Sequence, residues 1–372
     1  MRIPRITTIV GTRPELIRLS CILEKFEVCF EHRLVHTGQN SDPTLSQVFI
    51  NDLGIREPDV YLDITNKSLG NFCAQLFVEI ENEFDHFPPD AVVILGDTNS
   101  ALAGIIAKRK GIPVYHLEAG NRSFDVNVPE EINRKIVDHF SDYNLAYTQN
   151  AKQNLLTEGL LVNSLTVIGS PLREVLDKYR KKIEGSVVLE NLDLTTNSYF
   201  LVSAHRQENI DLYNRLGTLI ESINWIATEF KLPVVVSTHP RMRDKLEKHE
   251  SKLESNVLLH EPFSFFDYNK LQMNAKIVLS DSGSVPEEAA ILGFPAITIR
   301  DSMERPEALE SGSVIMSGIS KDGISEAIRI LSSLPQGVSV PIDYQVTDTS
   351  SRVVKFIAST IYSHNFRVGR RN

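Results

Sequence analysis

Short runs of β-branched and apolar residues recur along the chain, and longer stretches of helical length separate them. Strands that alternate with helices in this way indicate right-handed βαβ units and parallel sheets. The clearest helical stretches cover residues 100–110, 131–140, 216–230 and 286–292. The pattern predicts strands at residues 6–10, 34–35, 91–95, 114–117, 166–168, 199–203, 234–237, 257–259, 277–279 and 296–299.

The length of the chain fits two domains. Its 372 residues are enough for each domain to bury its own core. A polar stretch at residues 181–198 separates the two series of strands and indicates the boundary. We therefore expect an α/β protein of two Rossmann-like, doubly wound domains, residues 1–182 and 183–346. A helix within residues 347–372 is expected to return to the first domain.

Charge and composition exclude several classes of protein. The balance of 39 Lys+Arg against 48 Asp+Glu gives a net charge of −9, which disfavours binding to nucleic acids and anionic membranes. A small anionic substrate is still compatible with a local positive pocket. Cys21, Cys29 and Cys73 lack metal-site spacing and are expected to be reduced, partly buried thiols. Because we find neither a signal peptide nor a membrane-spanning stretch, we expect a cytoplasmic protein.

Polar motifs follow six of the predicted strands. In parallel sheets ligands bind beyond the carboxyl ends of the strands, where these motifs would lie. Singly, each motif has a structural explanation, such as a helix cap, a surface ion pair or a hydrogen-bonded histidine. Six motifs in phase with the strands predict one site. They are residues 11–15 (GTRPE), 96–99 (GDTN), 118–120 (EAG), 204–206 (AHR), 238–241 (THPR) and 280–284 (SDSGS).

The last of these motifs is suited to an anion. Pro286 would lie in the first turn of a helix, with backbone N–H groups beside Ser282 and Gly283 at its positive end. That arrangement suits a phosphate or diphosphate, and Glu288 could accept hydrogen bonds from ribose hydroxyls. The alternative is a simple helix cap formed by Ser284 or Asp281.

Carboxylates gather in the first half of the chain. Asp97, Glu118 and Glu130 could converge on one site, and their repulsion should raise at least one pKa towards neutrality for acid–base chemistry. We expect Glu131 to decorate the helix N-terminus while Glu130 faces the site. We expect residues 133–135 to solvate the outer face of that helix or to form salt bridges there.

Taken in order, the motifs resemble the non-hydrolysing UDP-N-acetylglucosamine 2-epimerases over nearly the whole chain. The resemblance implies the GT-B arrangement of two Rossmann-like domains, with the active site in the cleft between them. It also implies a homodimer and no cofactor or metal. The matching stretches are residues 11–15, 36–39, 96–98, 118–122, 129–134, 205–209, 281–283 and 304–307.

Three substitutions resemble a subgroup of that family. Arg18 stands where Lys is common, Asn121 where Leu is usual, and Ser284 where a second Gly is usual. These features are similar to the enzymes that convert UDP-2-acetamido-2,6-dideoxy-L-talose to UDP-N-acetyl-L-fucosamine for capsule or O-antigen polysaccharides. The alternative substrate is UDP-N-acetylglucosamine.

The resemblance also implies roles for individual residues. Asp97, Glu118 and Glu130 would move the C2 proton, and His205 and Arg13 would face the departing diphosphate. The remaining expected UDP-binding residues are Arg18, Tyr268, Ser282, Gly283, Ser284, Glu288 and Arg305, of which Arg18 and Tyr268 replace the usual Lys and Phe.

The chemistry of a 2-acetamido sugar agrees with these residues. No carbonyl acidifies the C2 proton, so inversion can proceed by eliminating UDP to a 2-acetamidoglycal and adding it back. Acids on both sides of C2 and a stabilised leaving diphosphate are then required. Three other functions stay open: a GT-B glycosyltransferase, a hydrolysing epimerase that releases free sugar, and an inactive nucleotide-sugar-binding protein.

Overall fold

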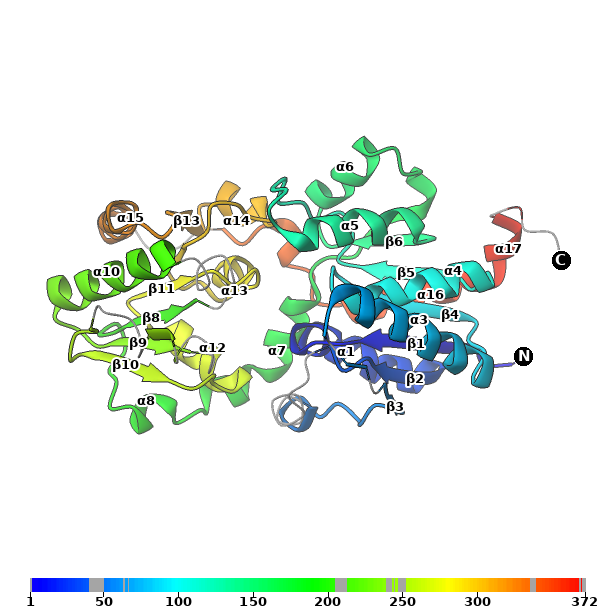
Figure 1. Cartoon of the computed structure of the whole chain (residues 1–372), viewed down its shortest axis with the longest axis horizontal. Helices are drawn as coiled ribbons and strands as arrows, with labels where there is room; N and C mark the ends of the chain where they lie inside the picture. The colour runs from blue at the N-terminus through cyan, green and yellow to red at the C-terminus, as the bar shows by residue number, and fades with distance from the viewer. Residues whose placement is uncertain are drawn as a thin grey trace. The chain divides into compact units, whose positions relative to one another are not determined.

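A computed structural model describes residues 2–39, 50–62, 64–65, 67–204, 213–238, 243, 245–246, 252–334, 339–367 and 369. The chain folds into two compact units (Figure 1). The first unit consists of Met1–Asp177 and Gln345–Asn372, and the second is Lys178–Tyr344. The division falls within helix α7 (Pro171–Glu184), ahead of the polar stretch in which the sequence analysis sets the boundary.

The first unit contains a parallel sheet of seven strands in the order β3-β2-β1-β4-β5-β6-β7. The order reverses between β1 and β4, which is the topological switch point where ligands bind in such sheets. The strands are β1 (Arg5–Val10), β2 (Glu31–His36), β3 (Val60–Tyr61), β4 (Ala91–Leu95), β5 (Val114–Leu117), β6 (Tyr143–Ala146) and β7 (Leu165–Val167).

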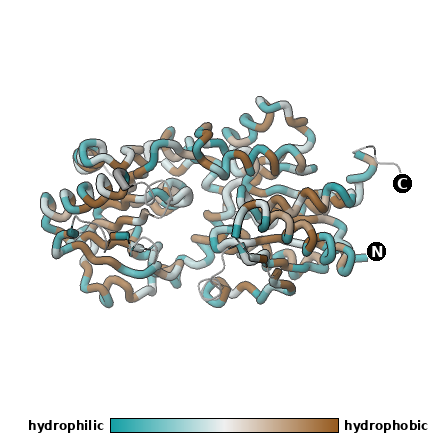
Figure 2. The backbone as a smooth tube through the Cα atoms, viewed as in Figure 1, coloured by the Kyte–Doolittle hydropathy of each residue, from teal (hydrophilic) through white to brown (hydrophobic). Residues whose placement is uncertain are grey.

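Helices cover both faces of this sheet. Val93 of β4 packs in the core with α1 (Arg13–Cys29) and α16 (Thr349–Thr360). Its neighbours Val92 and Ile94 pack in the other core, with α3, α4 and α5. β4, which is buried on both faces, is apolar along its length. Figure 2 shows such hydrophobic runs, in brown, in both units. The other helices are α3 (Leu69–His86), α4 (Gly104–Lys110), α5 (Pro129–Phe140), α6 (Gln149–Thr157) and α17 (His364–Arg367).

The second unit repeats this plan with six parallel strands in the order β10-β9-β8-β11-β12-β13. Phe200 and Val202 of β8 pack with α10 and α15, whereas Leu201 packs with α12 and α13 on the other face. The strands are β8 (Phe200–Ser203), β9 (Val234–Ser237), β10 (Val257–His260), β11 (Ile277–Ser280), β12 (Ala296–Thr298) and β13 (Val314–Met316). The helices are α8 (Val188–Asn191), α10 (Tyr213–Phe230), α12 (Phe265–Asn274), α13 (Val285–Leu292), α14 (Pro306–Glu310) and α15 (Lys321–Ser333).

The predicted class, two parallel-sheet α/β domains, is confirmed. Every predicted strand is present, and the structure adds β3, β6 and β13. β6 was missed because the buried Asn144 interrupts its apolar run, and β13 is short. Among the described residues, no helix is long and apolar enough to cross a membrane. The same part of the chain contains no group of His, Cys, Asp and Glu that could hold a metal ion.

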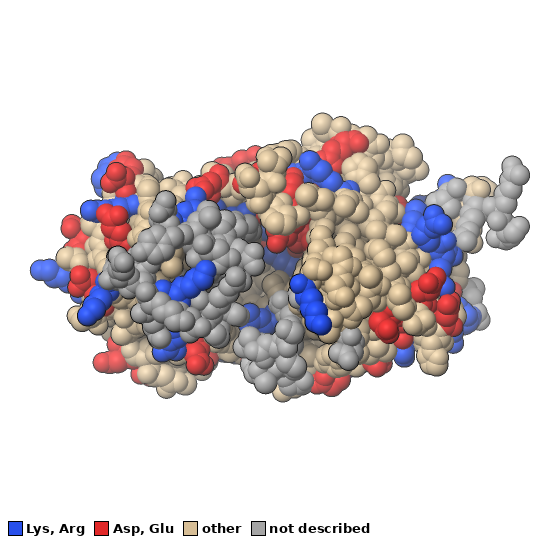
Figure 3. Space-filling view, viewed as in Figure 1, with Lys and Arg blue, Asp and Glu red and all other residues tan. Residues whose placement is uncertain are grey.

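Charged side chains of both signs are intermingled on the visible face of the molecule (Figure 3). The three cysteines are free thiols. Cys21 is buried and Cys73 is partly buried, as the sequence analysis expected, but Cys29 is exposed.

Gly11 directly follows β1, at a point where the backbone comes close to two hydroxyl groups. A Cβ added there would lie 2.0 Å from Ser100 Oγ and 2.5 Å from Thr37 Oγ1. We expect Gly11→Ala to lower the free energy of unfolding by about 1–3 kcal/mol, because this packed site must open to admit the methyl group. Urea unfolding measures the change.

The matched control is Gly70→Ala in α3, where an added Cβ meets nothing within 4 Å. We expect this variant to be neutral, or more stable by up to about 1 kcal/mol, because alanine favours helix over glycine. Equal losses in the two variants would contradict the steric explanation.

Candidate active site

The turn between β1 and α1 is organised around the buried carboxyl group of Glu15. The backbone N–H groups of Gly11 and Thr12 donate to Glu15 Oε2 at 2.9 and 2.7 Å, and the Thr12 hydroxyl donates to it at 2.8 Å. Thr98, which follows Asp97, donates its hydroxyl to Glu15 Oε1 at 3.0 Å. Glu15 therefore joins the turn after β1 to the turn after β4.

Burial raises the pKa of Glu15 to about 7, although the hydrogen bonds from Gly11, Thr12 and Thr98 act in the opposite direction. A carboxyl group of this kind can carry a proton near neutral pH. The sequence analysis expected a raised pKa among Asp97, Glu118 and Glu130, and it assigned no role to Glu15.

Asp97 follows β4 and is held by a buried arginine. Arg134 of α5 directs Nε and Nη2 to Asp97 Oδ2 at 2.8 and 2.6 Å. Asn133 donates its side-chain amide to the Asp97 carbonyl at 2.9 Å and to Asn99 Oδ1 at 3.0 Å. The prediction that residues 133–135 cover the outer face of the helix is therefore wrong for Asn133 and Arg134, which hold the turn after β4.

Glu118 follows β5 in a strained backbone conformation. Its φ of 67° lies in the left-handed region, which costs a residue with a side chain about 1–2 kcal/mol. Arg18 Nε lies 3.5 Å from Glu118 Oε2, and Asn121 donates Nδ2 to Glu118 Oε1 at 3.2 Å. Arg18 is buried, with its guanidinium carbon 5.8 Å from the centre of the Tyr147 ring. Local contacts thus fix both oxygens of the Glu118 carboxylate.

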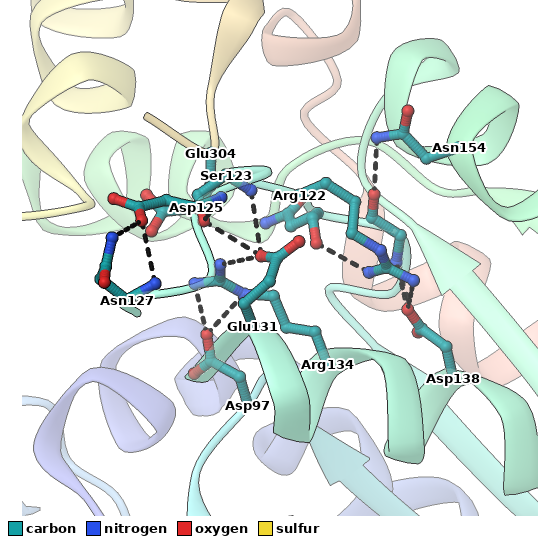
Figure 4. Close-up of polar contacts among 12 residues, drawn as sticks. Asp97, Arg122, Ser123, Asp125, Asn127, Glu131, Arg134, Asp138, Asn154 and Glu304 are labelled. Atoms are coloured by element: carbon teal, nitrogen blue, oxygen red, sulfur yellow. Dashed lines mark hydrogen bonds and ion pairs between the residues drawn. The ribbon is translucent and has the colours of Figure 1, made fainter. Parts of the chain in front are cut away.

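The two glutamates in the first turn of α5 differ in their exposure to solvent. Glu130 is exposed, and its predicted role towards the substrate stays a prediction. Glu131 is buried and accepts hydrogen bonds from Ser123 N at 3.0 Å and Arg134 Nη1 at 3.0 Å. Burial alone would raise its pKa, but the bonds from Ser123 and the charge of Arg134 lower it. Glu131 is thus not the exposed decoration that the sequence analysis expected, and Figure 4 shows Arg134 between it and Asp97.

The motif after β11 in the second unit leads directly into α13. Ser284 occupies the position before the helix, but its side chain does not cap it. Its Oγ lies 3.2 Å from Ser282 Oγ, and Ser282 N donates to Ser280 Oγ at 3.0 Å. Of the two capping residues that the simple-cap explanation allows, Ser284 is therefore excluded.

Glu288 lies one turn into α13 and is buried. Gln272 donates its amide to Glu288 Oε2 at 2.7 Å. Burial, together with the neighbouring Glu288 charge, raises the pKa of Tyr268, so the phenol keeps its proton. The second unit thus places Tyr268 near Glu288, two residues that the sequence analysis assigned to the nucleotide.

Buried arginine–glutamate pairs lie around the segment between β12 and α14. Arg305 Nε is 3.1 Å from Glu287 Oε2, and both side chains are nearly inaccessible to solvent. Arg300 pairs with both oxygens of Glu304 at 2.6 and 2.7 Å, next to Gly283. The sequence analysis named Arg305 but gave Glu287 and Arg300 no role. Arg305 and Glu287 belong to separate elements, and an ion pair of that kind leaves no local signal in the sequence.

The structure describes Arg13, one of the two residues predicted to face the diphosphate, but not the other, His205. Arg13 begins α1 and is half-buried. His205 lies outside the described residues, as do His239 and Arg241 of the fifth motif. The predicted roles of Arg13 and His205 therefore remain predictions.

Comparisons with known proteins point to one family. The family model described as UDP-N-acetylglucosamine 2-epimerase matches residues 24–358. The solved UDP-N-acetylglucosamine 2-epimerase of Rickettsia bellii is 39% identical, with a TM-score of 0.93 and full coverage of both chains. That of Methanocaldococcus jannaschii, solved with UDP-GlcNAc and UDP, is 34% identical with a TM-score of 0.89, covering 95% of this chain and 99% of its own.

A third similar protein carries a different substrate in its name. The UDP-2,3-diacetamido-2,3-dideoxy-D-glucuronate 2-epimerase of Pseudomonas aeruginosa is 33% identical over 362 residues. The match covers 95% of this chain and 99% of that protein. The matching proteins thus share a reaction position, C2, and differ in the sugar.

The raised pKa of Glu15 predicts a pH-dependent stability. The folded protein keeps the Glu15 proton up to about pH 7, whereas the unfolded chain loses it near the ordinary pKa of 4.5. Between these values the folded state binds more protons, so stability falls as pH rises. We expect Glu15→Gln to remove this slope. Urea unfolding measures the difference in free energy of unfolding between wild type and variant, which should fall by about 1–3 kcal/mol between pH 5 and pH 8.

Glu131→Gln serves as the control. Its pKa is lowered from 4.5, so the carboxylate is ionised in both states above pH 5. The difference between wild type and this variant should stay flat between pH 5 and pH 8. A flat difference for Glu15→Gln as well would show that Glu15 is ionised in the folded protein.

Proposed function

The chain belongs to the UDP-N-acetylglucosamine 2-epimerase family, and we propose that it inverts C2 of a UDP-N-acetyl sugar by eliminating UDP and adding it back. Membership in this family makes the chain an epimerase-type isomerase. The mechanism and the sugar are proposals, and both rest on the residues of the two units.

The observation that carries the proposal is the pair of carboxylates at the ends of β4 and β5. Leu95 and Leu117 are paired in the sheet, so the turns that carry Asp97 and Glu118 begin at the same level of neighbouring strands. Each carboxylate has a buried arginine partner, Arg134 or Arg18. Two fixed carboxylates beyond the carboxyl ends of neighbouring strands, one of them next to the switch point, suit proton transfer at one carbon.

The proposed reaction balances without a cofactor. One carboxylate takes the C2 proton while the C1–O bond breaks, and the electron pair of the C–H bond forms the C1=C2 double bond of a 2-acetamidoglycal. UDP leaves with the electrons of the C1–O bond. Its oxygen then returns to C1, and a second acid delivers a proton to the opposite face of C2. Asp97, Glu118 and the exposed Glu130 are the proposed acids and bases.

The second unit supplies the groups that suit UDP. The Ser282–Gly283–Ser284 turn leads into α13, where the positive end of the helix dipole favours a diphosphate. We assign the buried Glu288 to the ribose hydroxyls, and Tyr268 and Arg305 to the nucleotide. Arg13 and His205 are assigned to the leaving diphosphate, whose negative charge grows as the C1–O bond breaks.

UDP-N-acetylglucosamine is the first substrate to test, because it is named for the Rickettsia and Methanocaldococcus proteins. UDP-2-acetamido-2,6-dideoxy-L-talose is the second, and one structural observation favours it. Arg18 and Asn121, two of the substitutions that suggested the L-sugar, both contact the Glu118 carboxylate. The two substrates differ at C5 and in the 6-hydroxyl, and we assign the accommodation of that difference to the residues around Glu118.

The proposal predicts that solvent hydrogen enters the sugar at C2. Each UDP-sugar is incubated with the protein in deuterated water and followed by NMR. For the true substrate we expect deuterium at C2 of both epimers and no free sugar. Asp97→Asn and Glu118→Gln should slow this exchange by at least about 100-fold, because each removes a group that transfers the proton.

Three outcomes would contradict the proposal. Epimerisation without deuterium at C2 would overturn elimination, and free sugar accumulating with UDP would indicate a hydrolysing enzyme. UDP-sugar bound without any turnover would indicate a binding protein. Lys355→Ala is a suitable control, because this residue lies on α16 and belongs to no predicted motif, and exchange should proceed at the wild-type rate.

A further inference from the structure

Asp138 is a wholly buried carboxylate of α5 that belongs to none of the predicted motifs. The Gly120 N–H lies 3.2 and 3.3 Å from its two oxygens. Arg122 Nη2 is 2.7 Å from Asp138 Oδ2, a contact visible in Figure 4, and Arg122 is held in turn by Glu158. Asp138 on α5 therefore holds the turn that follows β5 through Gly120 and Arg122.

His116 of β5 extends this contact to the neighbouring turn. Its Nε2 lies 2.9 Å from the Gly96 carbonyl oxygen, and its Nδ1 lies 2.9 Å from Asp138 Oδ1. A carbonyl oxygen can only accept, so Nε2 carries a hydrogen. The Nδ1 contact is a close approach without hydrogen-bond geometry. His116 therefore lies between the Gly96 backbone and the Asp138 carboxylate.

The two ends of this arrangement are next to the proposed catalytic carboxylates. Gly96 immediately precedes Asp97, and Gly120 is two residues beyond Glu118. Both glycines have positive φ, 71° and 82°, as does Glu118 itself. Gly120 is further enclosed, because a Cβ there would lie 2.2 Å from the Ala151 carbonyl oxygen. One buried pair thus ties together the two turns that carry Asp97 and Glu118.

We propose that Asp138, acting through His116, is a positioning residue that fixes the separation of Asp97 and Glu118. It touches no reacting atom in this scheme, and its role rests on the proposed function of those two carboxylates. A displacement of about 1 Å between reacting groups can cost on the order of 100-fold in rate. Loss of the pair should therefore affect turnover far more than binding of the substrate.

Asp142 provides a matched control for a merely structural role. It is also an aspartate of the first unit whose side chain is buried, it accepts the Val114 N–H at 3.0 Å, and it pairs with Lys108. Val114 begins β5, so Asp142 anchors the opposite end of the same strand. Substitution of either aspartate removes a buried carboxylate that accepts a backbone N–H group. Of the two, only Asp138 contacts the turn after β5.

The test compares Asp138→Ala, Asp138→Asn and Asp142→Ala in the full chain by the rate of deuterium exchange at C2. For Asp138→Ala we expect kcat to fall about 100-fold while KM changes less than about threefold. Asp138→Asn should recover at least about tenfold of that loss, because its amide can accept from Gly120 and donate to His116 Nδ1. Asp142→Ala should keep kcat within about threefold of wild type, even where its melting temperature drops.

A second readout does not depend on activity. Amide hydrogen exchange followed by mass spectrometry should show faster exchange in the peptide containing Gly120 for Asp138→Ala, and unchanged exchange for Asp142→Ala. Wild-type kcat in Asp138→Ala, or equal protection of Gly120 with and without the carboxylate, would overturn the positioning role. Absence of C2 exchange in the wild type would overturn the proposed function, and the Gly120 readout would still decide the role of Asp138.

Discussion

The candidate site depends on α5, a helix whose charged face is buried against the turns after β4 and β5. Glu131, Arg134 and Asp138 lie three and seven residues apart on α5, which sets them on one face, and all three are buried. Ile132 and Ile136 of the same helix are 61% and 43% exposed. Burying charges costs several kcal/mol for each ion unless partners compensate. Here the partners lie in the turns after β4 and β5. The contacts that compensate the buried charges of α5 therefore also hold the turns that carry the candidate site.

This arrangement gives each proposed catalytic carboxylate a defined environment. Arg134 holds Asp97 from behind, while Arg18 and Asn121 contact the two oxygens of Glu118. Glu15 differs from both, because its bonds come from uncharged donors and burial raises its pKa to about 7. The proposed catalytic carboxylates are therefore not an unpaired acidic cluster, because Asp97 and Glu118 each contact an arginine.

Much of the fold could be predicted from the sequence, because strands buried on both faces leave continuous apolar runs. The runs at β4 and β9 are of this kind. β6 was missed because Asn144 is buried in it for a reason that lies elsewhere: its amide donates to the Asp138 carbonyl. The site motifs were found because they follow strands, but the inner face of α5 was assigned wrongly. Ile132 and Ile136 have the spacing of a buried stripe but are exposed. Only the tertiary partners of Glu131 and Arg134 show which face of the helix is buried.

The central claim is that the C1–O bond of a UDP-sugar breaks and re-forms on this protein. Positional isotope exchange tests it most directly: the substrate carries ¹⁸O in the bridge between C1 and the β-phosphorus, and ³¹P NMR follows the label during turnover. If UDP departs and returns, rotation of its free β-phosphate moves the label into non-bridging positions. Epimerisation with all of the ¹⁸O retained in the bridge would contradict the account.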